Sequence, residues 1–162
     1  MADEHIATYL NDHLAGSVAA LELLEHLEAA HANTALERFF AELRTDIAAD
    51  RQELETLMDR LNISQSRTRQ AAAWISGKIT ELQLRFDDPE GGALRLLEAL
   101  DILASGIEGK RALWMALAAA AEKASRLRAN DYERLIKRAA DQRERVEEVR
   151  LDAARASLGS TD

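Results

Sequence analysis

Polar residues interrupt four apolar stripes of the sequence, each near the middle of a long helical stretch. Residues spaced alternately by three and four share one face of an α-helix, so each stripe predicts a face buried against other helices. The interrupting residues are Ser17, Asp50, Lys110 and Gln142. If the helices are in register, these four side chains meet at one level inside a bundle. We call this set the central layer.

The chemistry of the central layer would be that of a buried ion pair. A charge buried without a partner costs several kcal/mol, so Asp50 and Lys110 at one level are expected to neutralise each other. Gln142 and Ser17 are expected to add hydrogen bonds. Three charged residues beside the stripes are expected to extend this network: Arg51, Glu53 and Arg111.

Three glycines also lie near the level of the central layer, namely Gly16, Gly106 and Gly109. A glycine inside a helix costs about 1 kcal/mol relative to alanine, so a local reason for each is expected. Either two helices approach each other closely here, or the bundle leaves space for something inside. Of the two explanations, we expect close approach.

Five helical segments account for the stripes and the breaks between them. Ala, Leu and Glu are abundant, whereas the whole chain has one Pro and seven Gly, which favours helices over strands. Short connections join the first two and the last two long helices as antiparallel hairpins. The long connection between the hairpins carries a shorter helix of its own. The expected helices cover residues 3–31, 34–61, 65–86, 93–123 and 131–157.

Short sequence signals mark where two of these helices begin. Thr34 and Glu37 have the spacing of a capping box, in which each side chain bonds the other residue's free backbone N–H. Residues 130–133, with Asp131 before the apolar stripe, predict a side-chain cap for the last helix.

The layout of two antiparallel hairpins and a long crossover resembles the ferritin-like superfamily, among the small uncharacterised bacterial proteins of that fold. The resemblance covers residues 3–157 and rests on the order and length of the helices. It implies an all-α fold, a ferritin-like four-helix bundle, formed by a single domain over residues 1–162.

The resemblance also implies where a di-iron or di-manganese site would lie. In ferritin-like metal enzymes, one helix of each pair supplies a Glu and the other supplies Glu-x-x-His. In chain order these places are held here by Ser17, by Asp50 and Glu53, by Lys110, and by Gln142 and Arg145. Lys110 brings a positive charge to a place where metal cations need negative ligands. The resemblance therefore implies the fold and argues against the metal chemistry.

We expect a non-catalytic bundle without a cofactor, in which the central layer replaces a di-metal site and the role is structural or in protein interaction. One alternative is a divergent iron- or manganese-dependent oxidoreductase or metal-binding protein, with ligands from Asp50, Glu53 and Glu108. A second alternative is a bundle that binds a small molecule, with the glycines and the central layer forming its pocket.

Composition limits the classes of partner. The net charge of −8 disfavours nucleic-acid binding, and the Arg-rich stretch 126–150 is interleaved with acids, which predicts a solvated, ion-paired helix face. The absence of Cys excludes disulfides and thiolate catalysis. The first residues are acidic and no apolar run has the length of a membrane span. We therefore expect a cytoplasmic protein without a membrane partner that forms a homodimer through its helix faces.

Overall fold

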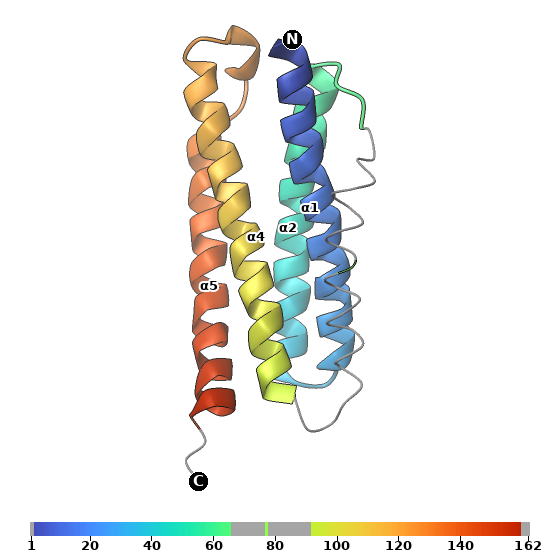
Figure 1. Cartoon of the computed structure of the whole chain (residues 1–162), viewed down its shortest axis with the longest axis vertical. Coiled ribbons are helices and arrows are strands. Elements are labelled where there is room, and N and C mark those ends of the chain that lie inside the picture. The colour runs from blue at the N-terminus through green and yellow to red at the C-terminus, as the bar shows by residue number, and fades with distance from the viewer. Residues whose placement is uncertain (1, 66–76, 78–91, 160–162) are drawn as a thin grey trace.

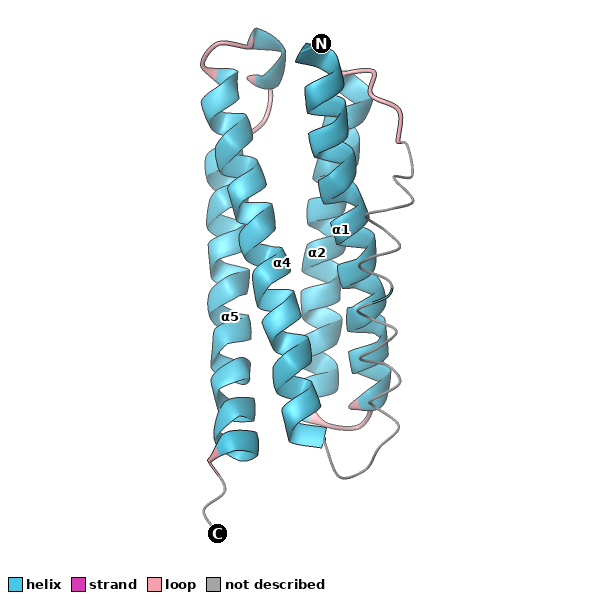
Figure 2. Cartoon of the chain, in the orientation of Figure 1, coloured by secondary structure: helices cyan, strands magenta, loops and turns pink. Residues whose placement is uncertain are grey.

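The computed structural model describes residues 2–65, 77 and 92–159 of the chain. Within these residues the structure is helical and contains no strand (Figure 2). The elements are α1 (Ala2–Ala30), α2 (Ala35–Arg60), α4 (Gly92–Ala121), the short 3₁₀ helix η2 (Ser125–Leu127) and α5 (Tyr132–Leu158). The four long helices of the described residues match the expected ones to within two residues at each end. The helix predicted over 65–86 lies outside the described residues, apart from residues 65 and 77.

The long helices form two antiparallel hairpins, α1 with α2 and α4 with α5 (Figure 1). The hairpins pack against each other through the backbones of α1 and α4, and side chains of α2 also bond to α4 and α5. Helix α2 ends at one end of the bundle and α4 begins at the other, so the connection between the hairpins has to run the length of the bundle. The helical bundle and the order of its hairpins are therefore as expected.

Buried apolar side chains form two separate clusters, one towards each end of the bundle. The cluster at the lower end in Figure 1 includes Leu24, Phe40, Leu43, Leu100 and Val146. The cluster at the upper end includes Leu14, Leu57, Trp114, Leu117 and Leu135. The two clusters are separated at the level of the predicted central layer, where the apolar stripes are interrupted.

The helix starts confirm one predicted cap and correct the other. Asp131 Oδ1 accepts a hydrogen bond from the backbone N–H of Arg134 at 3.1 Å, so Asp131 caps α5. The capping box predicted at Thr34 is wrong, because its hydroxyl donates to the carbonyl of His31 at 2.7 Å. The Glu37 carboxylate instead accepts from the backbone N–H of Asn33 at 2.6 Å. Asn33 has a φ of 65°, in the left-handed region, and its own N–H, rather than that of Thr34, lies within reach of Glu37.

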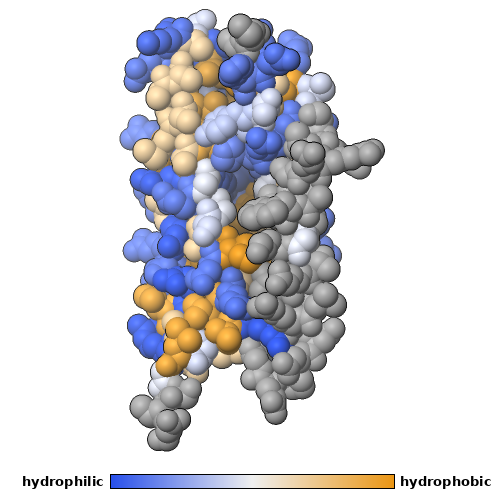
Figure 3. Space-filling model, viewed as in Figure 1, coloured by the Kyte–Doolittle hydropathy of each residue, from blue (hydrophilic) through white to orange (hydrophobic). Residues whose placement is uncertain are grey.

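Hydrophilic residues cover most of the described surface that Figure 3 shows, and hydrophobic residues gather near its lower end. Among the exposed large apolar residues are Leu94, near the start of α4, and Leu151 and Leu158, towards the end of α5. Exposed apolar residues of this kind are usual on protein surfaces. None of the described helices combines the length and the apolarity that crossing a lipid bilayer requires.

Asp131→Ala is expected to lower the free energy of unfolding by about 1 kcal/mol, because the N–H of Arg134 loses its acceptor. Urea denaturation followed by circular dichroism measures this loss. Thr34→Ala is the matched control, because the Thr34 side chain makes no cap bond, and its loss should stay below about 0.5 kcal/mol. Equal losses for the two variants would contradict this assignment of the caps.

Candidate functional site

Three helices contribute to the central layer through a closed set of hydrogen bonds. Lys110 Nζ, from α4, donates to Asp50 Oδ2 of α2 and to Gln142 Oε1 of α5. Gln142 Nε2 donates to the same Asp50 Oδ2 at 2.9 Å. Asp50 and Gln142 are 2% and 1% exposed. The structure thus brings together three of the four residues that the sequence placed in this layer.

A second cation, Arg138 of α5, belongs to the layer and was missed by the sequence analysis. Its Nη2 forms an ion pair with Asp50 Oδ1, so each carboxylate oxygen of Asp50 faces one cation. Arg138 precedes Gln142 by four residues and therefore lies on the same face of α5. The four-residue spacing from Gln142 could have indicated Arg138. The charged residues around it, however, made this stretch of the sequence resemble a solvated helix face.

The central layer combines one carboxylate with two cations in a largely buried position. Burial lowers the pKa of Lys110 from its ordinary value, against the opposing effect of Asp50, and Arg138 adds to the lowering. Only 15% of the Lys110 side chain is exposed. The layer therefore carries an excess of positive charge in a place where water cannot fully screen it.

Ser17 does not join the central layer, contrary to the prediction. Its hydroxyl donates to the backbone carbonyl of Leu14 at 2.6 Å, within α1. Serine side chains commonly bond to a carbonyl of the preceding turn, and this local bond removes the need for a partner on another helix. Helix α1 therefore contributes no hydrogen bond to the layer.

The three flanking residues expected to extend the network have other partners. Their ion pairs are Arg51 with Glu55 at 3.0 Å, Glu53 with Arg134 at 2.8 Å, and Arg111 with Glu108 at 2.9 Å. Residues next to a buried stripe point along the sides of a helix, where charged neighbours three or four residues away are closer than the interior. Among the described residues, none of the three forms a hydrogen bond or an ion pair with the central layer.

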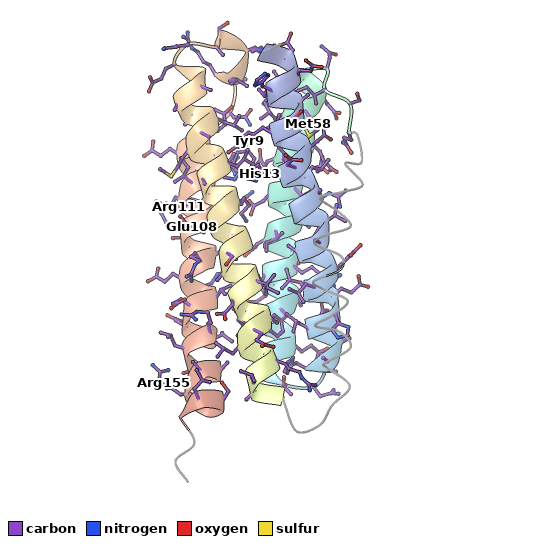
Figure 4. All side chains as sticks on the ribbon, in the orientation of Figure 1. Tyr9, His13, Met58, Glu108, Arg111 and Arg155 are labelled. Atoms are coloured by element: carbon purple, nitrogen blue, oxygen red, sulfur yellow. The ribbon has the colours of Figure 1, made fainter. Side chains whose placement is uncertain are left out.

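The carboxylates proposed as ligands of a divergent metal site are held apart. Asp50 is bonded within the layer, Glu53 to Arg134, and Glu108 to Arg111. Figure 4 shows Glu108 and Arg111 on the side of α4 that faces away from α1. The described part of the chain contains no group of three or more His, Asp or Glu residues that could hold a metal ion.

A cavity of about 800 Å³ lies beside the central layer. Residues of α1, α2 and α4 line the cavity. Asp50 of α2 and Lys110 of α4 line it from the central layer. Much of the remaining lining is apolar and includes Ala20, Leu23, Ile47, Leu54, Ile107 and Trp114. Small-molecule sites in proteins have volumes of about 300–1,000 Å³ and a lining of this kind.

The three glycines near the layer all line this cavity. A Cβ atom built on Gly16, Gly106 or Gly109 would meet no atom of the described residues within 4 Å. Among the described residues, therefore, no helix approaches these glycines closely. The other explanation, space inside the bundle, agrees with the structure.

Trp114 adds a buried donor next to the layer. The residue is 1% exposed, and its indole Nε1–H has no hydrogen-bond partner among the described residues. A buried donor without a partner costs about 1–3 kcal/mol. Trp114 lines the cavity, but its Nε1 atom is itself buried and does not face that space.

His13 lines the cavity from α1, and its ring meets the ring of Tyr9 edge-on, with centroids 4.8 Å apart. Figure 4 shows both side chains in the space between α1 and α4. Burial lowers the pKa of His13 from 6.5, against the opposing effect of Asp12. His13 is therefore neutral in the folded protein at pH 7.

Comparison with known proteins adds no relative to these observations: no family model matches the chain, and no characterised protein or solved structure shows significant similarity to it.

Asp50→Ala is expected to lower the free energy of unfolding by about 3–5 kcal/mol, because it leaves two cations without their carboxylate. Lys110→Ala should cost less, about 1–3 kcal/mol, because Arg138 still neutralises Asp50. Urea denaturation measures both values. Asp141→Ala, which removes an exposed aspartate paired with Lys137, is the control and should cost less than about 0.5 kcal/mol. A loss for Asp50→Ala as small as the control's would mean that the layer is not a buried ion pair.

The lowered pKa of His13 predicts a pH dependence of stability. The unfolded chain binds a proton at His13 more readily than the folded protein does, so the free energy of unfolding falls as the pH falls below 6.5. His13→Gln should reduce this fall between pH 7 and pH 5, measured by urea denaturation at about one-unit pH steps. His5→Gln changes an exposed histidine of the same helix and should leave the fall as it is in the wild type.

Proposed function

We propose that this protein is a non-catalytic helical bundle that binds a small molecule in the cavity between α1 and α4. The main support is the cavity of about 800 Å³, whose apolar lining includes a charged, hydrogen-bonded layer at one place. Binding sites for small molecules usually combine a mostly apolar wall with a few polar groups that orient the ligand. Asp50 and Lys110 are polar groups of this kind here.

The bonds within the central layer would prepare the cavity for a ligand. Lys110 is held by hydrogen bonds to two other helices, so its position is set before a ligand arrives. A group that is already ordered loses less conformational entropy on binding, which favours affinity. The ion-paired layer and the cavity thus act together in this proposal.

We also propose that the bundle is ferritin-like and that the central layer occupies the place of a di-metal site. The two hairpins, with α2 ending opposite the start of α4, support the ferritin-like layout. The two cations at Asp50 support the loss of metal chemistry, because they compete with metal ions for its oxygens. The divergent iron or manganese oxidoreductase has weaker support, because Glu53 and Glu108 have partners of their own.

The homodimer, the cytoplasmic location and the lack of a nucleic-acid partner stay predictions. Size-exclusion chromatography with light scattering would measure the oligomeric state directly.

Binding of a neutral apolar dye, Nile red, tests the proposed cavity. The dye is expected to bind one per chain with a rise in fluorescence. Gly109→Leu should weaken this binding by about tenfold or more, because the new side chain occupies the open space beside Gly109. Leucine favours the helix more than glycine does, so a loss of binding would not reflect unfolding.

Gly92→Leu is the matched control for Gly109→Leu. It makes the same replacement in the same helix, also where a Cβ meets no described atom, but Gly92 does not line the cavity. Dye binding by Gly92→Leu should equal that of the wild type. Equal affinity of the two variants for Nile red would show that the dye binds elsewhere and would count against the proposed function.

A further inference from the structure

The central layer becomes electrically balanced when one of its two cations loses a proton. Asp50 is shared by Lys110 and Arg138, so the layer carries one positive charge more than its carboxylate neutralises. Arg138 cannot lose the proton, because a guanidinium keeps its charge in proteins. Lys110 can, since the pKa of a buried lysine shifts readily, and Asp50 is then paired with Arg138 alone.

Burial and the second cation together lower the pKa of Lys110 from its ordinary value. Burial has the largest effect, and Arg138 adds to it. Asp50 and Asp46 of α2 act in the opposite direction, and Asp46 is also bonded to Arg145. The pKa stays lowered, so a larger fraction of Lys110 is neutral than of an ordinary exposed lysine.

Further charged or titratable side chains lie around Lys110, along the cavity and on the neighbouring turns of α4. They are Asp12 and His13 of α1, Arg51 of α2, and Glu98, Asp101, Glu108 and Arg111 of α4. Asp12 is exposed, so water weakens its effect, and His13 is neutral at pH 7. Arg51 and Arg111 have acidic partners of their own. Glu98 and Asp101 precede Lys110 by twelve and nine residues, about 18 and 14 Å along the helix.

A neutral lysine amine is a nucleophile, and Lys110 is placed to act as one. Its side chain lines the cavity and is 15% exposed. Nζ is bonded to two acceptors, Asp50 and Gln142. A neutral amine has two N–H groups and one lone pair, so these two bonds leave the lone pair outside the hydrogen bonds. Lysines in an apolar pocket or beside another cation are the ones that form Schiff bases with carbonyl compounds.

The rest of the cavity suits an uncharged molecule with a hydrocarbon body. Four acids and two cations line it, namely Asp12, Asp50, Glu98, Asp101, Arg51 and Lys110. Because the acids outnumber the cations, an anionic head group would be repelled, whereas an uncharged carbonyl would not. Ala20 and Leu23 of α1 and Ile107 of α4 belong to the apolar part of the lining, against which a hydrocarbon chain can pack.

From these observations we propose that the ligand is an apolar aldehyde, which the Lys110 amine binds covalently as an imine. This inference rests on the proposed function. The Nζ lone pair forms a bond to the carbonyl carbon as the C=O π bond breaks. Both amine protons then move to the oxygen, relayed by the Asp50 carboxylate that is bonded to Nζ, and the oxygen leaves as water. The imine is uncharged, so Asp50 and Arg138 still balance each other.

Reductive trapping of the full chain with decanal at pH 7 tests this reaction. Sodium cyanoborohydride reduces the imine to a stable secondary amine, which leaves one decyl group on each lysine that has reacted. Peptide mass mapping then gives the labelling rate of each lysine. Lys110 is expected to be labelled about tenfold or more faster than Lys137, which is exposed and whose pKa is raised by its hydrogen bond to Asp141. Equal rates for the two lysines would overturn the inference.

Two glycine variants test whether the aldehyde reaches Lys110 through the cavity. Gly109→Leu fills the open space beside Gly109 and should slow the labelling of Lys110 by about tenfold or more. Gly92→Leu makes the same replacement away from the cavity and should keep the wild-type rate. Selective labelling that is equally fast in both variants would mean that the aldehyde does not use the cavity, and would overturn the inference.

Arg138→Gln tests the second cation through the pH profile of labelling. The profile for Lys110 should move to higher pH, because the substitution removes a charge that lowers the Lys110 pKa. Arg143→Gln is the matched control, because Arg143 lies on the same helix, is paired with Glu147 and does not line the cavity. Its profile should coincide with that of the wild type. Circular dichroism checks that both variants are folded, and an unmoved profile in Arg138→Gln would overturn the role of the second cation.

Nile red separates this inference from the function on which it rests. Lack of selective labelling at Lys110, with Nile red binding still sensitive to Gly109→Leu, would overturn the imine and leave the proposed function standing. Failure of Nile red to bind, together with equal labelling of Lys110 and Lys137, would overturn both.

Discussion

A buried carboxylate shared by two cations holds the middle of this bundle together. Asp50 on α2 is bonded to Lys110 on α4 and to Arg138 and Gln142 on α5, so one side chain connects three helices. Sliding any of these helices by one turn, about 5.4 Å, would leave a charge buried without its partner. Apolar contacts tolerate such shifts more easily, because they are not directional. The axial register of α2, α4 and α5 therefore depends on Asp50.

The same layer explains why the apolar interior is divided and why one side is hollow. The two apolar clusters are separate at this level. Helix α1 adds no polar partner to the layer there, because Ser17 bonds within its own helix. Between α1 and α4, the described residues leave a space that is lined by three glycines and by apolar side chains such as Leu23 and Ile107. The cavity thus lies on the side of the layer where α1 adds no hydrogen bond to the network.

Much of this arrangement could be predicted from the sequence, because a charge inside an apolar stripe is a specific signal. Asp50 is the one charged residue on a stripe that is otherwise apolar, and the hairpin lengths then place Lys110 and Gln142 at the same level. Arg138 was not predicted, because the charged residues around it made that stretch of α5 resemble a solvated surface. The space beside the glycines could not be predicted either, since a helical glycine fits close packing and a cavity equally well.

The position of Trp114 also gives the protein an intrinsic optical reporter. Indole emission depends on the polarity around the ring and on hydrogen bonding at Nε1, and here the ring is buried while Nε1 has no partner within the described chain. A molecule that entered the cavity would change the polarity beside the ring. The chain has one other tryptophan, Trp74, outside the described residues. Replacing Trp74 with phenylalanine would leave a single tryptophan, whose emission wavelength would report occupancy of the cavity without an added label.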